Sequence, residues 1–449
     1  MTRSTILDGN SFSTADADLL SVGDRDLVAR RQRVLGPSYR LFYRRPLHLV
    51  RGSGTRVYDA DGREYLDAYN NVASIGHCHP AVVEAVHRQM RTLNTHSRYL
   101  QRGILDYADQ LLATFPAGLD TVMFTNSGSE SNDLALRIAR HATGGTGVVV
   151  TAEAYHGTTS LVADVSPAMG SDHPLGSFAA AVPAPDAYRR GGGEQLGEWF
   201  AGRITAAFDE LRSRGIRPAA FLADTIFASD GVLSDPAVLG PAVRAVHAAG
   251  ALFVADEVQP GFARTGASFW GFARHGVVPD LVTLGKPMGN GVPVAAMVGR
   301  REIVGRFGAE VPYFNTFGGS SVPIAAARAV LDVIESEGLA ARSEELGQRI
   351  RREVRGLAER HAAIGDVRGA GLFLGIEIVS DRDRRTPDST LALALVNTLR
   401  DLGVLVSVAG PSNNVLKVRP LLVYSDADVA LFLERLDEAL ALCSAAVPL

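Results

Sequence analysis

The sequence predicts an α/β protein, with a mostly parallel sheet in a large domain and a smaller α+β domain. Two observations support this prediction. Between residues 122 and 298, short apolar runs alternate with segments of helical periodicity, and the runs end in polar or glycine-rich residues. Such nearly continuous apolar strands are typical of a sheet that helices cover on both faces. After about residue 325 the alternation stops and long helical patterns dominate.

The N-terminal part of the chain is expected to form an arm, one helix and a small β-meander. Residues 1–45 are polar and weakly periodic, which favours the arm and the helix. Residues 48–67 contain strand-like runs, and Asp61-Gly62 supplies a hairpin turn between two of them. A helix over residues 80–92 follows, because Pro80 suits the first turn of a helix.

Six apolar runs are the predicted strands of the large domain: residues 122–125, 148–151, 220–224, 252–256, 281–284 and 295–298. In sheets of this kind a ligand binds beyond the carboxyl ends of the strands, where these runs become polar. The smaller domain is expected to contain helices over 324–337, 342–359 and 426–442 and a strand over 372–378. We therefore expect three parts: an arm with a small-domain segment (1–70), the large domain (71–323) and the C-terminal small domain (324–449).

The composition indicates a globular protein and argues against several other classes. The 449 residues carry a formal net charge of −4, so no general attraction to nucleic acid or to an anionic membrane is expected. No stretch approaches the roughly 18 apolar residues of a membrane-spanning helix, and the first residues lack the apolar centre of a secretory signal. Cys78 and Cys443 cannot build a disulfide framework. These features predict a cytoplasmic enzyme.

Lysine is scarce in this chain, which draws attention to one position. Only two of the 45 basic residues are lysines, Lys286 and Lys417. Arginine does not deprotonate to an amine nucleophile, whereas a lysine whose pKa is lowered by burial does. Lys286 follows an apolar strand and adjoins Gly285, which suits a lysine that forms a Schiff base. A P-loop is excluded, because no Ser or Thr follows Lys286. Lys417 is expected to be solvated or ion-paired.

Further segments suggest what Lys286 binds. Residues 125–130 lie between a strand and a helix and can bind a phosphate, although simple helix capping explains the pattern equally well. Asp256 ends a buried strand; it either caps a loop or pairs with a protonated heterocyclic nitrogen. Tyr155 can stack on a flat ring, and residues 315–319 offer a second set of phosphate contacts. Together, an amine, a carboxylate, an anion site and an aromatic ring indicate pyridoxal 5′-phosphate.

Other conspicuous residues have structural interpretations. His77, Cys78 and His79 have no further Cys or His at ligand spacing, so they predict a turn and no metal site. His156 is either a cofactor neighbour or a hydrogen-bonded structural histidine. Arg264 is expected in a surface ion pair.

These motifs resemble those of the class III aminotransferases, which are fold-type I enzymes that depend on pyridoxal phosphate. The resemblance covers most of the chain and includes residues 126–130, 155–157, 255–266 and 316–319 as well as the Lys286 segment. Residues 69–80 and 93–100 are most similar to the branch that contains ethanolamine-phosphate phospho-lyase and alanine–glyoxylate aminotransferase-2-like proteins. The resemblance implies a small domain made of N- and C-terminal segments. It also implies a homodimer with shared active sites, or a tetramer.

The resemblance also implies a role for each matching residue. Lys286 and Asp256 are the implied catalytic residues: the lysine forms the Schiff base and carries protons, and the aspartate pairs with the pyridinium nitrogen. The implied cofactor-binding residues are Ser127, Gly128, Ser129, Tyr155, His156, Asp256, Val258 on one ring face, Gln259 near the 3′-oxygen, Lys286, and Thr316 of the partner subunit. The implied substrate-binding residues are Arg419, Tyr69, Asn71 and Asp224. Relatives usually carry Glu in place of Asp224, whose side chain is one methylene shorter.

Two reactions suit this set of residues. Transamination, which moves an amino group from an amine or amino acid to a 2-oxo acid by ping-pong turnover, is the leading prediction, because Arg419 suits a carboxylate-bearing substrate. The alternative is a lyase that expels phosphate and ammonia from a phosphorylated amino alcohol, as the resemblance around Asn70 and Asn71 implies. A binding protein that has lost catalysis is the third hypothesis, and the presence of Lys286 and Asp256 argues against it.

Overall fold

The central element of the structure is a seven-stranded mixed sheet. The structure is a computed structural model that describes residues 8–266 and 268–445. The strands occur in the order β4 (Thr121–Thr125), β10 (Ala295–Gly299), β9 (Leu281–Leu284), β8 (Leu252–Asp256), β7 (Pro218–Asp224), β5 (Gly147–Thr151) and β6 (Ala179–Val182). β10 runs antiparallel to both of its neighbours, and the other pairs are parallel. The predicted α/β class with a mostly parallel sheet is confirmed.

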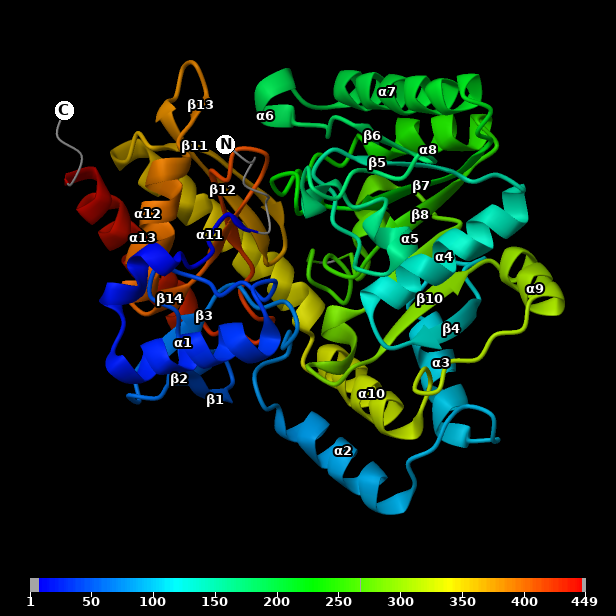
Figure 1. The fold of residues 1–449 in the computed structure, drawn as a ribbon, viewed down its shortest axis with the longest axis horizontal. Helices are drawn as coiled ribbons and strands as arrows, with labels where there is room; N and C mark the ends of the chain where they lie inside the picture. Colours follow the sequence, from blue (N-terminus) through cyan, green and yellow to red (C-terminus); the bar gives the residue numbers. More distant parts are fainter. Residues whose placement is uncertain (1–7, 267, 446–449) are drawn as a thin grey trace.

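Helices cover both faces of this sheet. Successive residues of a strand point to opposite faces, and in the central strands both sets of side chains are apolar, so both faces need to be buried. In β7, Phe221 belongs to one buried apolar cluster and Leu222 belongs to another. α7 and α8 pack over the Phe221 face, whereas α4 and α9 pack over the Leu222 face (Figure 1). The bounds of these helices are α4 (Gly128–Thr143), α7 (Glu194–Ser213), α8 (Leu239–Ala248) and α9 (Arg301–Glu310).

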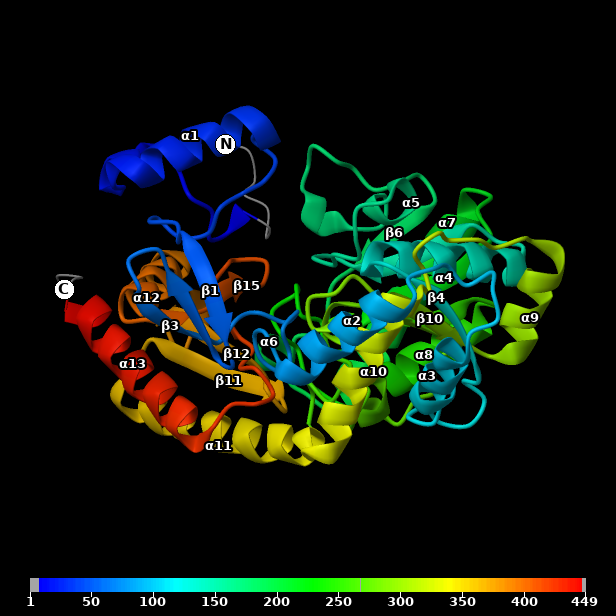
Figure 2. The same ribbon diagram turned by 90° about the horizontal axis from the view of Figure 1, so that it is seen from below.

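A smaller part of the molecule combines both ends of the chain in two further sheets. The expected meander is β1 (Leu49–Ser53), β2 (Arg56–Asp59) and β3 (Glu64–Asp67), and β14 (Val404–Leu405) pairs in parallel with β3. The other sheet has the order β11 (Ile364–Ala370), β12 (Phe373–Asp381), β16 (Val415–Val418) and β15 (Ser407–Ala409), with β13 (Thr386–Pro387) beside β12. Figures 1 and 2 show the N-terminal segment (blue) beside the C-terminal one (orange and red). The division of the chain at residues 70 and 323 stays a prediction.

The remaining helices surround these sheets. They are α1 (Val22–Leu35), α2 (Pro80–Thr92), α3 (Arg102–Leu112), α5 (Ser160–Ala163), α6 (Ala187–Arg190), α10 (Ser321–Ser336), α11 (Leu339–Arg360), α12 (Ser389–Asp401) and α13 (Asp426–Ala445). α2 has the bounds expected from the sequence, and α10 packs against both α2 and α3. Within the described residues, no helix is long and apolar enough to cross a membrane.

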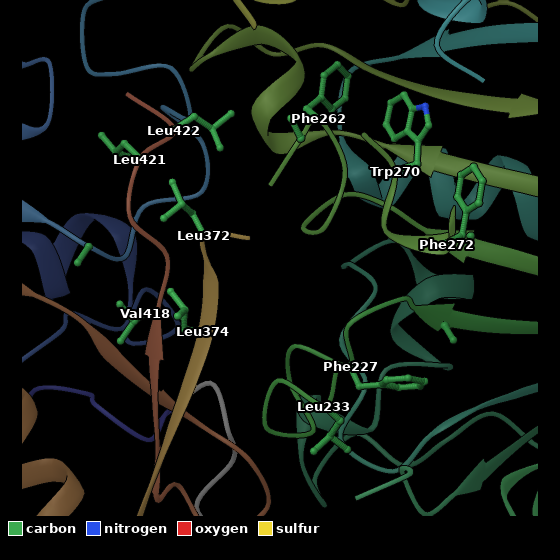
Figure 3. Packing of buried hydrophobic residues seen from close by; sticks show 14 of the residues in the cluster. Phe227, Leu233, Phe262, Trp270, Phe272, Leu372, Leu374, Val418, Leu421 and Leu422 are labelled. Atoms are coloured by element: carbon green, nitrogen blue, oxygen red, sulfur yellow. The ribbon is translucent and has the colours of Figure 1, made fainter. Parts of the chain in front are cut away.

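One buried apolar cluster extends across both parts of the molecule. From the small part it includes residues of β12, β16 and the segment after β16, and from the large part it includes residues of the loops that follow β7 and β8 (Figure 3). The labelled members are Phe227, Leu233, Phe262, Trp270, Phe272, Leu372, Leu374, Val418, Leu421 and Leu422. Burial of this surface stabilises the contact between the two parts, so side chains from both can line one cavity.

Candidate active site

The carboxyl ends of three adjacent strands bring polar side chains together. In the sheet register, Asp224 of β7 lies opposite Asp256 of β8, and Asp256 lies opposite Thr283 of β9. Lys286 follows β9 and begins a turn of 3₁₀ helix, Lys286–Gly289. The parallel strands therefore place the predicted carboxylate and the predicted amine on the same edge of the sheet.

Asp256 is buried and held by three donors. His156 Nδ1 lies 2.7 Å from Oδ2, Asn132 Nδ2 donates to the same oxygen at 2.9 Å, and the Val258 backbone N–H donates to Oδ1 at 3.1 Å. Burial by itself raises the pKa of the Asp256 carboxyl, but the hydrogen bond and charge of His156, and then Asn132 and Lys286, outweigh it and lower the pKa. Asp256 is therefore an ionised carboxylate at neutral pH, and it is suited to pair with a cation.

Asn132 is a residue of this site that the sequence analysis missed. It lies on α4 and is fully buried. Its Nδ2 group donates both to Asp256 and to the His156 backbone carbonyl, at 2.8 Å, while its Oδ1 accepts from Thr283 Oγ1 at 2.6 Å. Asn132 thus joins the helix to two strand ends and fixes the orientation of the carboxylate. The sequence contained one signal for this role: Asn132 is a polar residue at a position where the apolar pattern of residues 128–143 predicts a buried side chain.

Lys286 projects into a cavity of about 560 Å³ between the two parts of the molecule. Its side chain is accessible from that cavity, although protein surrounds it. Burial lowers the pKa of the Lys286 amine, Asp256 partly counteracts this, and Arg419 adds to the lowering. A lowered pKa increases the share of the neutral, nucleophilic amine.

The N-terminus of α4 has the close packing expected of an anion site. Ser127 is the N-cap and accepts from the Glu130 backbone N–H at 3.2 Å, so the capping role is observed for Ser127. Ser129 Oγ accepts from the Thr158 backbone N–H at 3.1 Å. A Cβ on Gly157 would lie 2.4 Å from Ser129 Oγ, so only glycine fits there. The first N–H groups of a helix have no partner within it, which favours a bound phosphate.

Tyr155, Gln259 and Lys286 are the predicted cofactor residues that line this cavity, and together with the residues around Asp256 they fit pyridoxal phosphate. Val258 is buried against Gly128, where an added Cβ would lie 3.0 Å from its methyl carbons. Tyr155 lines the cavity, and among the described residues the buried His156 Nε2 has no hydrogen-bond partner and remains available to a bound group. The chain thus offers an amine for the aldehyde, Asp256 for the ring nitrogen, side chains for the ring and a helix N-terminus for the phosphate.

Arg419 and Gln259 form a hydrogen-bonded pair in the lining of the cavity. Arg419 Nη1 donates to Gln259 Oε1 at 2.7 Å, and the guanidinium carbon lies 4.4 Å from the centre of the Tyr69 ring. Asn71 Nδ2 donates to the Gln259 backbone carbonyl at 2.9 Å. All four residues line the cavity. The predicted substrate residues Arg419, Tyr69 and Asn71 are therefore brought together, and the side chain of Gln259 contacts the arginine.

The cavity does not include Asp224, which the sequence analysis placed among the substrate residues. Its Oδ1 accepts from the Ile226 backbone N–H at 2.9 Å, and its Oδ2 accepts from the Ala228 backbone N–H at 3.2 Å. Burial and the charge of Asp256 raise the pKa of Asp224 to about 6. The short side chain folds back onto its own loop and forms no hydrogen bond or ion pair with Arg419. Burial lowers the pKa of that arginine, although the charge of Asp224 raises it.

Two structural interpretations from the sequence are wrong. Arg264, expected in a surface ion pair, is buried and donates to the backbone carbonyls of Leu372 and Pro420. Lys417, expected to be solvated or ion-paired, is only 7% exposed, lines the cavity and has no ion-pair or hydrogen-bond partner among the described residues. Both side chains lie in the interior. The sequence did not reveal this, because the segments that cover them are distant in sequence.

The predicted cofactor residue Thr316 lies apart from the cavity of its own chain. It is exposed in the loop between α9 and α10. The neighbouring Asn315 accepts from Asn126 Nδ2 at 2.9 Å and donates to Glu130, beside the first turn of α4. Thr316 thus stays available to a second subunit.

Comparisons with known proteins show the family to which this chain is similar. The family model of the class-III aminotransferases matches residues 42–440. The chain is 37% identical over 437 residues to ethanolamine-phosphate phospho-lyase homolog 1 of Caenorhabditis elegans, with 93% of each protein covered. It is 41% identical over 425 residues to the alanine–glyoxylate aminotransferase 2-like protein of Drosophila melanogaster, with 91% of this chain and 85% of the relative covered.

Two solved structures extend the comparison. A phospholyase from Arthrobacter in complex with phosphoethanolamine superimposes with a TM-score of 0.90 at 42% identity, covering 94% of this chain and all of that one. A PLP-bound amine transaminase from an uncultivated Pseudomonas species gives a TM-score of 0.79 at 26% identity, covering 88% and 95%. These similarities confirm the fold-type I architecture and indicate pyridoxal phosphate as the cofactor.

Proposed function

Because this chain belongs to the class III aminotransferase family of pyridoxal-phosphate enzymes, we propose that it is a phospho-lyase acting on a small phosphorylated amine, with O-phosphoethanolamine as the first candidate. With this substrate, O-phosphoethanolamine and water give acetaldehyde, ammonia and phosphate. The high similarity to a phospholyase in complex with phosphoethanolamine supports the choice of substrate.

The positive charge of Arg419 carries the proposal. Arg419 is buried, contacts the neutral amide of Gln259 and has no ion-pair partner among the described residues. A transaminase binds two substrates in turn, and an arginine used for only one of them must be neutralised for the other. Asp224, one methylene shorter than the usual Glu, bonds to backbone N–H groups of its own loop and forms no ion pair with Arg419 within the described residues. A cation that stays unpaired suits an enzyme with one anionic substrate.

Each residue of the site would have a separate role in this reaction. Pyridoxal phosphate, when bound, supplies a carbonyl that condenses with amines and a ring that accepts electrons from the adjacent carbon. Asp256 would keep the ring nitrogen protonated, because its own lowered pKa holds it ionised. Lys286 Nζ would remove the proton from the carbon that bears the substrate nitrogen. Arg419 would bind the anionic end of the substrate and orient it. We also propose that the other residues assigned to the cofactor in the sequence analysis would bind it: Ser127, Gly128, Ser129, Tyr155, His156, Val258, Gln259 and the partner subunit's Thr316.

The direct test is incubation of the holoenzyme with O-phosphoethanolamine in the absence of any 2-oxo acid. We expect many turnovers, with phosphate and ammonia released in equal amounts. Ethanolamine, which lacks the leaving group, is the matched control and should release neither product. Consumption of one equivalent per site, with further turnover only after a 2-oxo acid is added, would reject the lyase and establish a transaminase.

Transamination remains the second candidate because Arg419, which lines the cavity, can bind a carboxylate as well as a phosphate. A guanidinium that binds phosphate also binds carboxylate in a bidentate manner, and Arg419 faces the cavity beside Gln259. An amino acid and a 2-oxo acid both carry such a carboxylate. A panel of amino donors with a 2-oxo acid, assayed for the amino acid product, distinguishes this reaction from the first.

We further propose that the enzyme is a homodimer whose active sites include Thr316 of the partner subunit. The segment after α2 and the loop before α10 expose large apolar side chains: Leu100 fully, and Phe317 at 67%. An exposed apolar patch of this kind marks an interaction surface. Phe317 directly follows Thr316 in the sequence, which is consistent with an interface beside the active site.

Replacing Leu100 with aspartate is expected to weaken the dimer, since a buried charge has no partner in an apolar interface. The dissociation constant should rise at least about 30-fold, corresponding to a loss of ~2 kcal/mol, and activity should fall on dilution. Sedimentation velocity measures the association. Leu442→Asp on α13, which is also an exposed leucine, is the control and should leave it unchanged. Equal association of the two variants would contradict the proposed interface.

A further inference from the structure

A second amine, the buried Lys417, shares the cavity with Lys286. Lys417 lies on β16, and Arg419 follows two residues later, so both side chains point to the same face of that sheet. The two cations contact one aromatic ring: Lys417 Nζ lies 5.7 Å and the Arg419 guanidinium carbon 5.6 Å from the centre of Phe373. Both line the same cavity as Lys286. The cavity therefore contains two further basic side chains, Lys417 and Arg419, besides the proposed cofactor lysine.

The carboxylates near Lys417 are engaged elsewhere. Asp224 accepts from two backbone N–H groups, as described above. Asp230 accepts from Thr151 Oγ1 at 2.7 Å and from the Glu153 backbone N–H at 3.0 Å, and its pKa is raised to about 7 by burial. Asp67, which lines the cavity, lies 2.7 Å from His77 Nε2. None of the three forms an ion pair with Lys417 within the described part of the chain.

We infer that Lys417 and Arg419 together form the binding site for the phosphate group of the substrate, with Ser407 beside them. Ser407 of β15 lies directly opposite Lys417 in the strand register and also lines the cavity. A phosphate dianion has enough acceptor oxygens for an ammonium, a guanidinium and a hydroxyl at once. This inference rests on the proposed function and names the residues that select a dianion over a singly charged carboxylate.

The electrostatics agree with this geometry. Burial and the charge of Arg419 lower the pKa of Lys417 well below its usual value, Asp224 raises it, and Lys286 lowers it further. A buried ammonium in such surroundings is costly unless an anion lies close to it. A substrate phosphate supplies that charge, whereas a neutral substrate end leaves the cost in place.

The test measures binding of inorganic phosphate to the holoenzyme, in which the cofactor already fills its own phosphate site. Lys417→Met removes the charge at similar length, and Lys417→Arg keeps it. By calorimetry, the phosphate dissociation constant should rise about 10- to 100-fold in Lys417→Met and far less in Lys417→Arg. Acetate, with a single charge, is the control ligand and should show a much smaller change. Equal phosphate affinity of the wild type and Lys417→Met would overturn the inference.

A second measurement needs no variant. Because Lys286 and Lys417 are the two lysines of the chain, mass spectrometry after amine-specific labelling of the holoenzyme reports on Lys417 by its own peptide. Inorganic phosphate should protect Lys417 from labelling and acetate should not. Labelling that ignores phosphate would overturn the inference, even if Lys417→Met fails to fold.

These readouts separate the two proposals. Phosphate binding and labelling require no turnover, so they retain their meaning if the enzyme fails to cleave O-phosphoethanolamine. Conversely, an active phospho-lyase whose phosphate affinity is the same in Lys417→Met would keep the proposed function and reject the role of Lys417. In the supporting case, Lys417→Met should also raise KM for O-phosphoethanolamine more than it lowers kcat.

Discussion

Replacement of Lys286 with alanine is expected to lower kcat at least about 10⁴-fold, whichever of the two reactions the enzyme catalyses. Lys286 is the amine beside Asp256 and Gly285, with a pKa lowered by burial. Loss of a proton-transfer group at the reacting carbon costs up to about 10⁴-fold, and loss of covalent cofactor attachment adds to it. Steady-state release of phosphate or of the amino acid product measures the effect.

A separate experiment identifies the lysine that holds the cofactor. Borohydride reduction of the wild-type holoenzyme, followed by peptide mass spectrometry, should find the cofactor fixed to Lys286. Lys417→Met is the matched control and should retain this attachment. Because Lys417 lines the same cavity, it is the competing amine. A cofactor fixed to Lys417 in the wild type would show that the assignment of Lys286 is wrong.

Conversion of Asp256 to asparagine is expected to lower kcat about 10³-fold with little change in fold. The substitution preserves the shape of the side chain but removes the negative charge that faces the cofactor site. His156 and Asn132, which lie 2.7 and 2.9 Å from Oδ2, would lose their charged acceptor. Loss of preorganised electrostatic stabilisation at a reacting group costs about 10²- to 10³-fold, and cofactor affinity should fall as well. Assays at saturating cofactor separate the two effects.

The adjacent Glu257 supplies a matched control. It is also completely buried, and burial raises its pKa to about 7. Its carboxyl oxygens accept from Thr225 Oγ1 and from the backbone N–H groups of Gly271 and Phe272, away from His156. Glu257→Gln should therefore lower the melting temperature while kcat changes much less than in Asp256→Asn. An equal loss of kcat in both variants would mean that Asp256 acts through stability alone.

The sequence was sufficient for the parts of the site that depend on neighbouring residues. A glycine before Lys286, an aspartate at the end of an apolar run and a capped helix start are short-range patterns. Each corresponds to a local element of the structure: the strand that ends at Asp256, the turn that begins at Lys286 and the helix that Ser127 caps. The strand β6 was missed because its residues, Ala179–Val182, are mostly alanine, which has little preference for strands. Its place in the sheet comes from pairing with β5.

The environment of Lys417 and Arg264 could not be inferred in this way. Lys417 shares its cavity with Ser229 and Lys286, residues more than a hundred positions away, and Arg264 is buried against carbonyls of residues 372 and 420. Periodicity reports which face of an element is apolar, but not which distant segment covers it. The expectations of a surface ion pair for Arg264 and of a solvated or ion-paired side chain for Lys417 were therefore wrong.

The chain alone thus predicts the α/β class and the cofactor, which are confirmed, and the amine that serves it, which stays a prediction, because all three follow from residue types and short spacings. The folded molecule shows which side chains line the cavity. It places Asp224 against its own loop, and it brings Lys417 and Arg419 to one cavity. The physical reason is that the pKa and the partners of a charged side chain depend on the groups around it. The groups around Lys417 and Arg419 come from β16, β7 and β9, which come together only when the two parts of the protein pack around their common core.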